Sequence, residues 1–398
     1  MTRTILLLTT ALVAGAAPAA AQRLRVGIPI EQLEASARTD SNDAAAQYNL
    51  GLGYWSKARY DDAEKSFQRA IAIEPRFALA HLALAYLPFA RRSKLWDETL
   101  EGKVPTDWTA AVHTSDLEYR RAMMADPLVD LKIMGAVEPG IPAIWQANDY
   151  LAKIYEVIFR GFDDFRDGKY ESAYSRFNQQ AQALDWDGHR ERASTSFLYY
   201  RGLSAAHIGR FPEAVDDIQM IYARLEEDEA DHRDSITYLP LRTNEFRYLL
   251  ADLMVLNGDP RDAAPLFQKV AETDAGNFMA HVRLADLREA AHDWDAAVNE
   301  RHRAIDANPD DASLETDLGM TLGKAGRFAD AEVAFAEAAR ANPHDTRSLY
   351  WLGIARANLG KAPEAKQAFQ QFVATAPSRF ARQIDAAKAR IAQLGGAQ

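Results

Sequence analysis

Small, aromatic and apolar residues recur along this chain with a period of 34 residues. Gly319 is followed at fixed offsets by Ala331, Phe335, Ala338 and Pro343, and the same order recurs elsewhere. The small marker positions that lie one period apart are Gly51 and Ala85 in one group, and Ala251, Ala285, Gly319 and Gly353 in another. Because residues three or four apart share one face of a helix, the pattern predicts two helices per period. The small residues then lie where the two helix axes come closest.

Proline and glycine mark the ends of these predicted helices. The second helix of a period is followed by Pro75, Pro309, Pro343 or Pro377, a residue that stops a helix. The turn between the two helices carries Gly168, Gly209, Gly258, Gly326 or Gly360. Glycine suits the left-handed conformation that closes a helix.

The spacing resembles that of the tetratricopeptide repeat family, with Leu50, Leu318 or Leu352 before the glycine and Tyr54 three residues after Gly51. The resemblance covers most of residues 44 to 395. It implies an all-α fold, a right-handed α-solenoid of antiparallel helix pairs. We expect eight repeats, beginning near Ala44, Ala78, Ile154, Thr195, Asn244, Phe278, Ala312 and Thr346. The segment from Phe380 to Leu394 is expected to form a single capping helix over the last core.

The first residues have the three-part pattern of a secretory signal peptide. Arg3 supplies a positive charge, an apolar run follows to Ala17, and small residues precede Gln22. The alternative is an ordinary core helix at the N-terminus. We expect cleavage near Ala21, a lead-in over residues 22–43, and a location in the periplasm or outside the cell. The apolar run is shorter than the roughly 20 residues that span a bilayer, so no stable membrane anchor is expected after cleavage.

Two stretches depart from the regular period and are interpreted as insertions. One lies at about residues 92–108 and the other at about 128–142. Insertions in a solenoid emerge on one face and often carry function, although each can equally be a plain surface loop. Acidic residues after Leu225 interrupt the array again, so we expect the repeats to divide near residue 235, into residues 44–235 and a regular array over 236–398.

Composition narrows the range of partners. The chain has a net charge of −11 and no cysteine, so disulfides cannot stabilise it. Binding to nucleic acid requires clustered Lys and Arg, which the acidic balance does not favour. The same balance argues against electrostatic docking on an anionic membrane.

The sequence shows no motif that predicts catalysis. It contains neither a phosphate-binding GxxxxGK[ST] pattern nor a zinc-binding HExxH pattern. The residues around Asp163 and Gly168 resemble a calcium loop, but Tyr174 stands where a glutamate is required, so a helix-closing turn is the better interpretation. We therefore expect no catalytic residues, no metal site and no cofactor.

In the family that this chain resembles, the first helix of each repeat lines a concave groove that binds a partner. The positions implied here are Tyr48, Leu52, Tyr86, Tyr248, Asp252, Val282, Asp286, Thr316, Met320, Tyr350 and Ile354. The alternative for each is packing between neighbouring repeats. Asp252 and Asp286 lie one period apart, and no Lys or Arg is expected beside them in the groove, which favours a basic partner.

These features favour an exported, non-enzymatic scaffold that binds peptides or partner helices. The alternative is an enzyme or small-ligand receptor whose pocket is formed by the two insertions and lined by Trp96, Trp108 and Trp145. Fold alone does not decide between them, because function resides in the sites that a fold carries.

Overall fold

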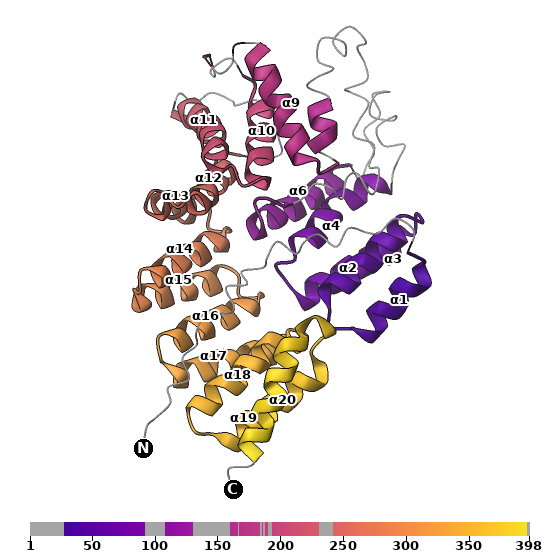
Figure 1. Cartoon of the computed structure of the whole chain (residues 1–398), viewed down its shortest axis with the longest axis vertical. Helices are drawn as coiled ribbons and strands as arrows, with labels where there is room; N and C mark the ends of the chain where they lie inside the picture. Colours follow the sequence, from indigo (N-terminus) through magenta and orange to yellow (C-terminus); the bar gives the residue numbers. More distant parts are fainter. Residues whose placement is uncertain are drawn as a thin grey trace. The chain divides into compact units, whose positions relative to one another are not determined.

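The structure is a computed structural model that describes residues 28–91, 108–129, 160–165, 167–183, 185, 188–189, 193–230 and 242–395. Every regular element in these ranges is a helix, in agreement with the predicted all-α class (Figure 1). The chain divides into two compact units, residues 1–77 with 275–398, and residues 78–274. The boundary predicted near residue 235 falls inside the second unit.

The first unit combines one N-terminal repeat with three C-terminal repeats. Its helices are α1 (Ile30–Thr39), α2 (Ala44–Trp55), α3 (Tyr60–Ile73), α14 (Phe278–Ala290), α15 (Trp294–Ala307), α16 (Ser313–Lys324), α17 (Phe328–Ala341), α18 (Thr346–Asn358), α19 (Ala362–Thr375), the 3-10 turn η3 (Ser378–Phe380) and α20 (Ala381–Gly395). Helix α1 lies where the sequence indicated only a lead-in, and its Leu33 and Ala37 pack against Leu50. The closely packed helix pairs are neighbours along the chain, from α1 with α2 to α19 with α20.

The second unit holds the remaining repeats. Its helices are α4 (Ala78–Ala90), α6 (Trp108–Ala125), α9 (Tyr170–Ala183), α10 (Thr195–His207), α11 (Phe211–Ala230), α12 (Thr243–Asn257) and α13 (Pro260–Thr273). Helical residues 160–165 precede α9 and form part of the repeat predicted near Ile154. The helix starts observed in both units follow the predicted repeat starts within a few residues.

Each glycine marker lies against a phenylalanine ring of the second helix of its repeat. A Cβ atom on Gly319 would be 2.6 Å from Cε1 of Phe335, and one on Gly51 would be 2.4 Å from Cε1 of Phe67. Such distances are far below van der Waals contact, so the ring would have to shift to admit a side chain at these glycines. Ala331, at the other small slot, is completely buried. The predicted close contact between the two helices of a repeat is confirmed.

The turns inside the repeats are closed by left-handed residues. All five predicted turn glycines have positive φ, between 69° and 93°. In the turn after α16, the Arg327 amide donates to the carbonyl of Leu322, five residues earlier, as in a Schellman motif. Ala58 and His292 occupy the equivalent slot in two other repeats with φ of 57° and 59°. These two residues carry a steric cost that glycine avoids.

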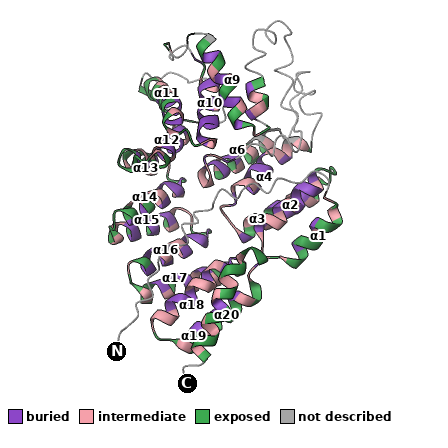
Figure 2. Cartoon of the chain, in the orientation of Figure 1, coloured by how far each residue is buried: buried purple, intermediate pink, exposed green. Residues whose placement is uncertain are grey.

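The first helix of a repeat is more deeply buried than the second. Along α12 the buried residues run from Phe246 to Leu253 almost without interruption, whereas α13 buries only one stripe, Ala263, Phe267 and Val270 (Figure 2). A first helix packs against the second helices on both sides of it, which explains the difference. Helix α20 caps the last core through partly buried Ile384, Ile391 and Leu394, as the sequence predicted. Within the described ranges, none of the helices has the length and apolar character needed to traverse a bilayer.

Candidate protein-binding surface

Six of the predicted groove residues lie inside the packed helices. The buried ones are Tyr48, Leu52, Tyr248, Val282, Thr316 and Ile354. The Tyr48 ring packs against Phe67 and Phe77, and the Tyr248 hydroxyl donates a hydrogen bond to the Met124 carbonyl at 3.2 Å. For these six the structure favours packing within and between repeats over contact with a ligand, because both faces of a first helix are covered.

The other five predicted groove residues are partly exposed. They are Tyr86, Asp252, Asp286, Met320 and Tyr350. Burial raises the pKa of the Tyr86 phenol well above its ordinary value. The Tyr350 ring is held between Phe372 at 5.2 Å and Phe369 at 5.9 Å between centroids. Met320 and Asp286 keep the exposure that contact with a partner requires.

The expectation that Asp286 has no cation beside it is wrong. Its Oδ1 accepts from Nη2 of Arg301 at 2.6 Å, and Arg283 lies 3.9 Å from its other oxygen. Arg301 lies on α15, the second helix of the same repeat, whereas Arg283 lies on α14 itself. The charge of Asp286 is therefore partly neutralised, and its pull on a basic partner is weaker than the sequence indicated.

The predicted insertion residues lie at or beyond the edges of the described ranges. Trp96 and Trp145 lie outside the described residues, and of Trp108 only the backbone, at the first position of α6, is described. No group of three or more potential metal ligands comes together in the described part of the chain.

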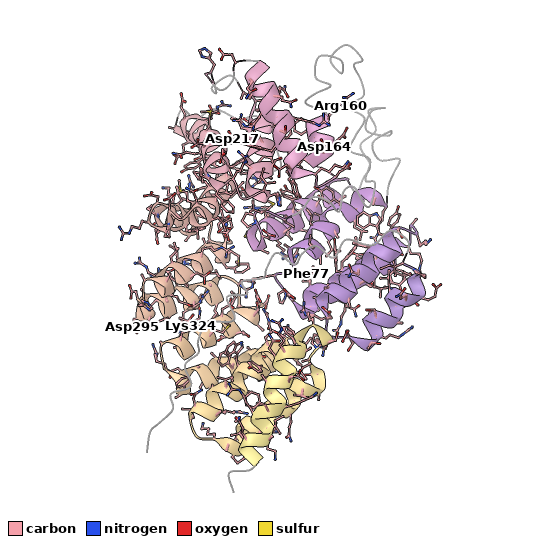
Figure 3. All side chains as sticks on the ribbon, viewed as in Figure 1. Phe77, Arg160, Asp164, Asp217, Asp295 and Lys324 are labelled. Atoms are coloured by element: carbon pink, nitrogen blue, oxygen red, sulfur yellow. The ribbon has the colours of Figure 1, made fainter. Side chains whose placement is uncertain are left out.

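Arg301 is the centre of a buried ionic network that joins two consecutive repeats of the first unit. Only 5 % exposed, it donates to Glu289 at 2.8 Å and to the Thr321 hydroxyl at 3.0 Å. Lys324, labelled in Figure 3, donates to the other oxygen of Glu289. Burial opposes ionisation of Glu289, but the positive charges of Arg301 and Lys324 outweigh it, so the pKa of Glu289 is lowered. The network fixes α14 and α16 as one surface.

A short stretch of the N-terminal repeat, the Ala72–Phe77 segment, is bound to α16 by its arginine. Arg76 Nη2 donates to Asp317 at 2.7 Å, and its Nε donates to the Ser313 hydroxyl at 3.0 Å. Asp311, which is 3 % exposed, lies 3.4 Å from Nε. Burial opposes ionisation of Asp317, yet the charges of Arg76 and Arg301 lower its pKa. The guanidinium thus occupies an acidic site built by the start of α16.

The backbone of the same segment is also recognised. The Asn342 side-chain amide donates to the carbonyls of Ala72 at 3.2 Å and Ile73 at 3.4 Å. Arg379 donates to Glu74 at 3.3 Å. The C-terminal repeats therefore contact carbonyl, carboxylate and guanidinium groups of one six-residue stretch.

Further polar contacts extend this seam toward α1 and α2. The Ser378 amide and hydroxyl donate to Asp40 at 3.0 and 2.9 Å. Asn42 donates to the Thr375 carbonyl at 3.2 Å, and its side-chain oxygen lies 3.1 Å from the His344 ring. A cavity of about 10 Å³ remains between His344, Arg347 and Arg379, room for no more than one water molecule.

The repeat pattern does not predict this seam, because the pattern relates neighbouring helices and the partners here lie more than 230 residues apart in the chain. One weak signal was available. The residue after each helix-ending proline is Arg76, Asp310, His344 or Ser378. Three of these four polar residues take part in the seam.

Repeated antiparallel helix pairs, joined by left-handed turns and closed by a terminal cap, define a helical-repeat protein. Three segments match sequence models described as tetratricopeptide repeat, over residues 44–77, 254–316 and 316–380. The chain belongs to the tetratricopeptide repeat family, whose members in general bind other proteins and are not enzymes.

Several solved structures are similar to this chain. The C-terminal part of a TPR repeat-containing protein from Cytophaga hutchinsonii is 13 % identical, with 60 % of this chain and 95 % of that chain covered and a TM-score of 0.45. A crystal structure of MamA is 21 % identical, with 44 % and 93 % covered and a TM-score of 0.36. MamA from Desulfovibrio magneticus RS-1 is 17 % identical, with 46 % and 94 % covered and a TM-score of 0.37. No curated protein sequence matches the chain.

Proposed function

We propose that this chain is an exported scaffold that binds protein segments on the surface formed by α14, α16 and α18, the first helices of the last three repeats. One observation carries the proposal. This surface and the loops beside it already hold a six-residue stretch of polypeptide, Ala72–Phe77, through its backbone carbonyls and its charged side chains. A surface with such donors and acceptors in place can recognise a segment of another protein.

The proposed contacts with a partner are the partly exposed residues of this surface. Asp286 and Met320 occupy the same slot of adjacent repeats, and Arg301 connects their helices through Asp286 and Thr321. An apolar anchor beside polar groups is typical of the centre of a protein interface. The charged side chains around Arg301 bind one another, which suits a structural role better than acid–base chemistry and supports a non-enzymatic function.

The test is affinity capture of partners by the mature chain, followed by mass spectrometry. We expect the wild type to capture a partner that Met320→Lys loses, because a charged side chain at the centre of the interface leaves an unpaired cation on binding. The matched control is Val333→Lys on α17, where the native side chain is 69 % exposed on a second helix. If both variants capture the same proteins as the wild type, this surface is not the binding site.

The proposed export rests on the signal-like residues 1–21, which lie outside the described residues. We expect a mature form that begins near Gln22, located in the periplasm or outside the cell. N-terminal sequencing of the protein from the extracytoplasmic fraction tests this. A protein that retains Met1 and is found only in the cytoplasm contradicts it.

A further inference from the structure

Two ion pairs that bind the Ala72–Phe77 segment to the C-terminal repeats are within reach of water, whereas its partners Ser313, Asp311 and Asn342 are buried. Arg76 and Asp317 are 19 % and 23 % exposed, and the pair of Glu74 with Arg379 is 26 % and 36 % exposed. The closely packed helix pairs of the first unit all lie within α1–α3 or within α14–α20. The buried clusters of Leu33 and of Phe369 likewise each stay on one side of the seam.

These two ion pairs compete with solvent and can be replaced by other charged ligands. Partly exposed ion pairs contribute little stability each and are screened by salt. The contacts of the segment therefore differ from the glycine–phenylalanine contacts inside the repeats, which a ligand cannot replace.

We propose, building on the function proposed above, that the C-terminal repeats are a site for a linear segment bearing a carboxylate and a guanidinium two residues apart, and that Ala72–Phe77 is an intramolecular competitor for it. The partner is a protein whose exposed segment repeats the chemistry of Glu74 and Arg76. The first repeat must leave the site before that partner can bind there.

The geometry selects arginine over lysine at the cationic position. Arg76 uses Nε toward Ser313 and Asp311 and Nη2 toward Asp317, so its planar head contacts three groups at once. A lysine ammonium lacks this planar fork and cannot reproduce the pattern. The Asn342 amide requires free carbonyls two and three residues before the proline position. Pro75 ends helix α3, which leaves the carbonyls of Ala72 and Ile73 for Asn342, and the Phe77 amide donates to the Glu74 carbonyl at 3.0 Å in the turn that follows.

Intramolecular occupancy lowers the apparent affinity for an outside segment, because only the fraction of molecules with an open site can bind. Removing the competitor should therefore tighten binding of the same segment supplied in trans. This prediction separates a binding site from a seam that serves stability alone.

The experiment uses a fluorescein-labelled peptide with the sequence of residues 70–79, titrated with the full mature chain and followed by fluorescence anisotropy. We expect Arg76→Gln to bind the peptide at least tenfold more tightly than the wild type. Adding Asp317→Asn to Arg76→Gln should abolish that gain. A peptide with glutamine at the position of Arg76 should bind neither, and one with lysine there should bind weakly.

Circular dichroism confirms that each variant is folded, and Glu74→Gln, which weakens the pairing with Arg379, gives a second and milder opening of the seam. Equal affinity of the peptide for wild type, Arg76→Gln and Glu74→Gln overturns the proposal. Partner capture that depends on Met320 can persist in that case, and the scaffold function then stands without the competitor. If the peptide binds Arg76→Gln tightly but the chain captures no partner, the intramolecular competitor stands and the scaffold function does not.

Discussion

The two units join their repeats by different mixtures of buried charges and aromatic rings. In the first unit, Arg301 reaches from α15 to Asp286 and Glu289 on α14 and to Thr321 on α16, so buried ions join consecutive repeats. In the second unit aromatic rings contribute to these junctions, and Arg247 of α12, which is 3 % exposed, donates to the Tyr222 hydroxyl of α11 at 2.9 Å. Tyr200 of α10 packs 4.8 Å from Phe162, between ring centroids.

The second unit also contains a buried ion pair, but this pair lies within one repeat and not between two repeats. Arg201 of α10 forms two hydrogen bonds with Asp217 of α11, so it joins the two helices of one repeat. Contact from α10 to the next first helix is again aromatic, with Tyr199 and Phe246 at 5.8 Å. The comparison teaches that the repeat slots determine the helix pair, while the space between pairs can be filled with ions or with rings.

Breaking the ionic junction should have the largest effect. Arg301→Met leaves Glu289 buried beside an apolar side chain, and we expect a loss of about 3–5 kcal/mol in the stability of the first unit. Hydrogen exchange should show lost protection in α14–α16, with α10–α12 unchanged. The control is Arg303→Met, since Arg303 is 57 % exposed and its ion pair should contribute at most about 1 kcal/mol. Equal effects of the two substitutions would show that the network is not a structural centre.

Overpacking inside one helix pair should have the second-largest effect on stability. Gly319→Leu drives a side chain into the Phe335 ring, and Ala331→Leu fills a completely buried slot. Each should destabilise the first unit by about 1–3 kcal/mol. Urea denaturation monitored by circular dichroism measures the change, with exposed Val333→Leu as the neutral control. An unchanged midpoint for both core variants would mean that the repeat register is misassigned.

Acid should distinguish the two kinds of junction. The pKa values of Glu289 and Asp317 are lowered against burial by neighbouring cations. Their ionised forms stabilise the folded state above their ordinary pKa values of 4.5 and 3.8, and that contribution is lost as pH falls through the lower folded values. Protection of α14–α16 should therefore fall below about pH 4. In Glu289→Gln this dependence should be flatter, and a slope equal to that of the wild type would contradict the assignment.

The second unit should lose stability as the pH rises, whereas the first unit loses stability as the pH falls. Burial raises the pKa values of Tyr119 and Tyr199 above their ordinary value of 10.0. The neutral phenols stabilise the fold below pH 10, and this contribution is lost as pH rises through the folded pKa values. Ultraviolet difference titration should show phenols that ionise only on unfolding. Tyr119→Phe should remove one of them, and full titration near pH 10 with the fold intact would refute the burial.

The smallest effect is expected at the left-handed turns. Ala58→Gly and His292→Gly relieve the strain of a positive φ. Because glycine also has more conformational entropy in the unfolded chain, we expect a net gain in stability of up to about 1 kcal/mol. Gly326→Ala should change stability with the opposite sign, because nothing lies within 4 Å of an added Cβ and only the backbone is strained. Thermal melts compare the three variants. A gain from Gly326→Ala would contradict the backbone argument.

The fold could be predicted from the sequence because it depends on local spacing. The Gly319–Phe335 contact and the left-handed Gly326 follow from residues within one period. The binding surface could not be predicted in the same way. Position along a first helix does not reveal whether a side chain such as Tyr248 is covered by the next repeat, nor which second-helix arginine reaches Asp286. The partners of Arg76 are separated from it by most of the chain, and helix α1 carries only a short apolar stripe.

The account depends most on the seam between the first repeat and the last ones, and one distance measurement tests it directly. The chain has no cysteine, so Lys65→Cys on α3 and Ala389→Cys on α20, both exposed in the native chain, provide the only two sites for spin labels. In dilute protein, pulsed electron paramagnetic resonance should give one narrow, short distance that broadens toward longer values in Arg76→Gln/Arg379→Gln. A broad, long distribution in the wild type, unaltered by these substitutions, would contradict the seam.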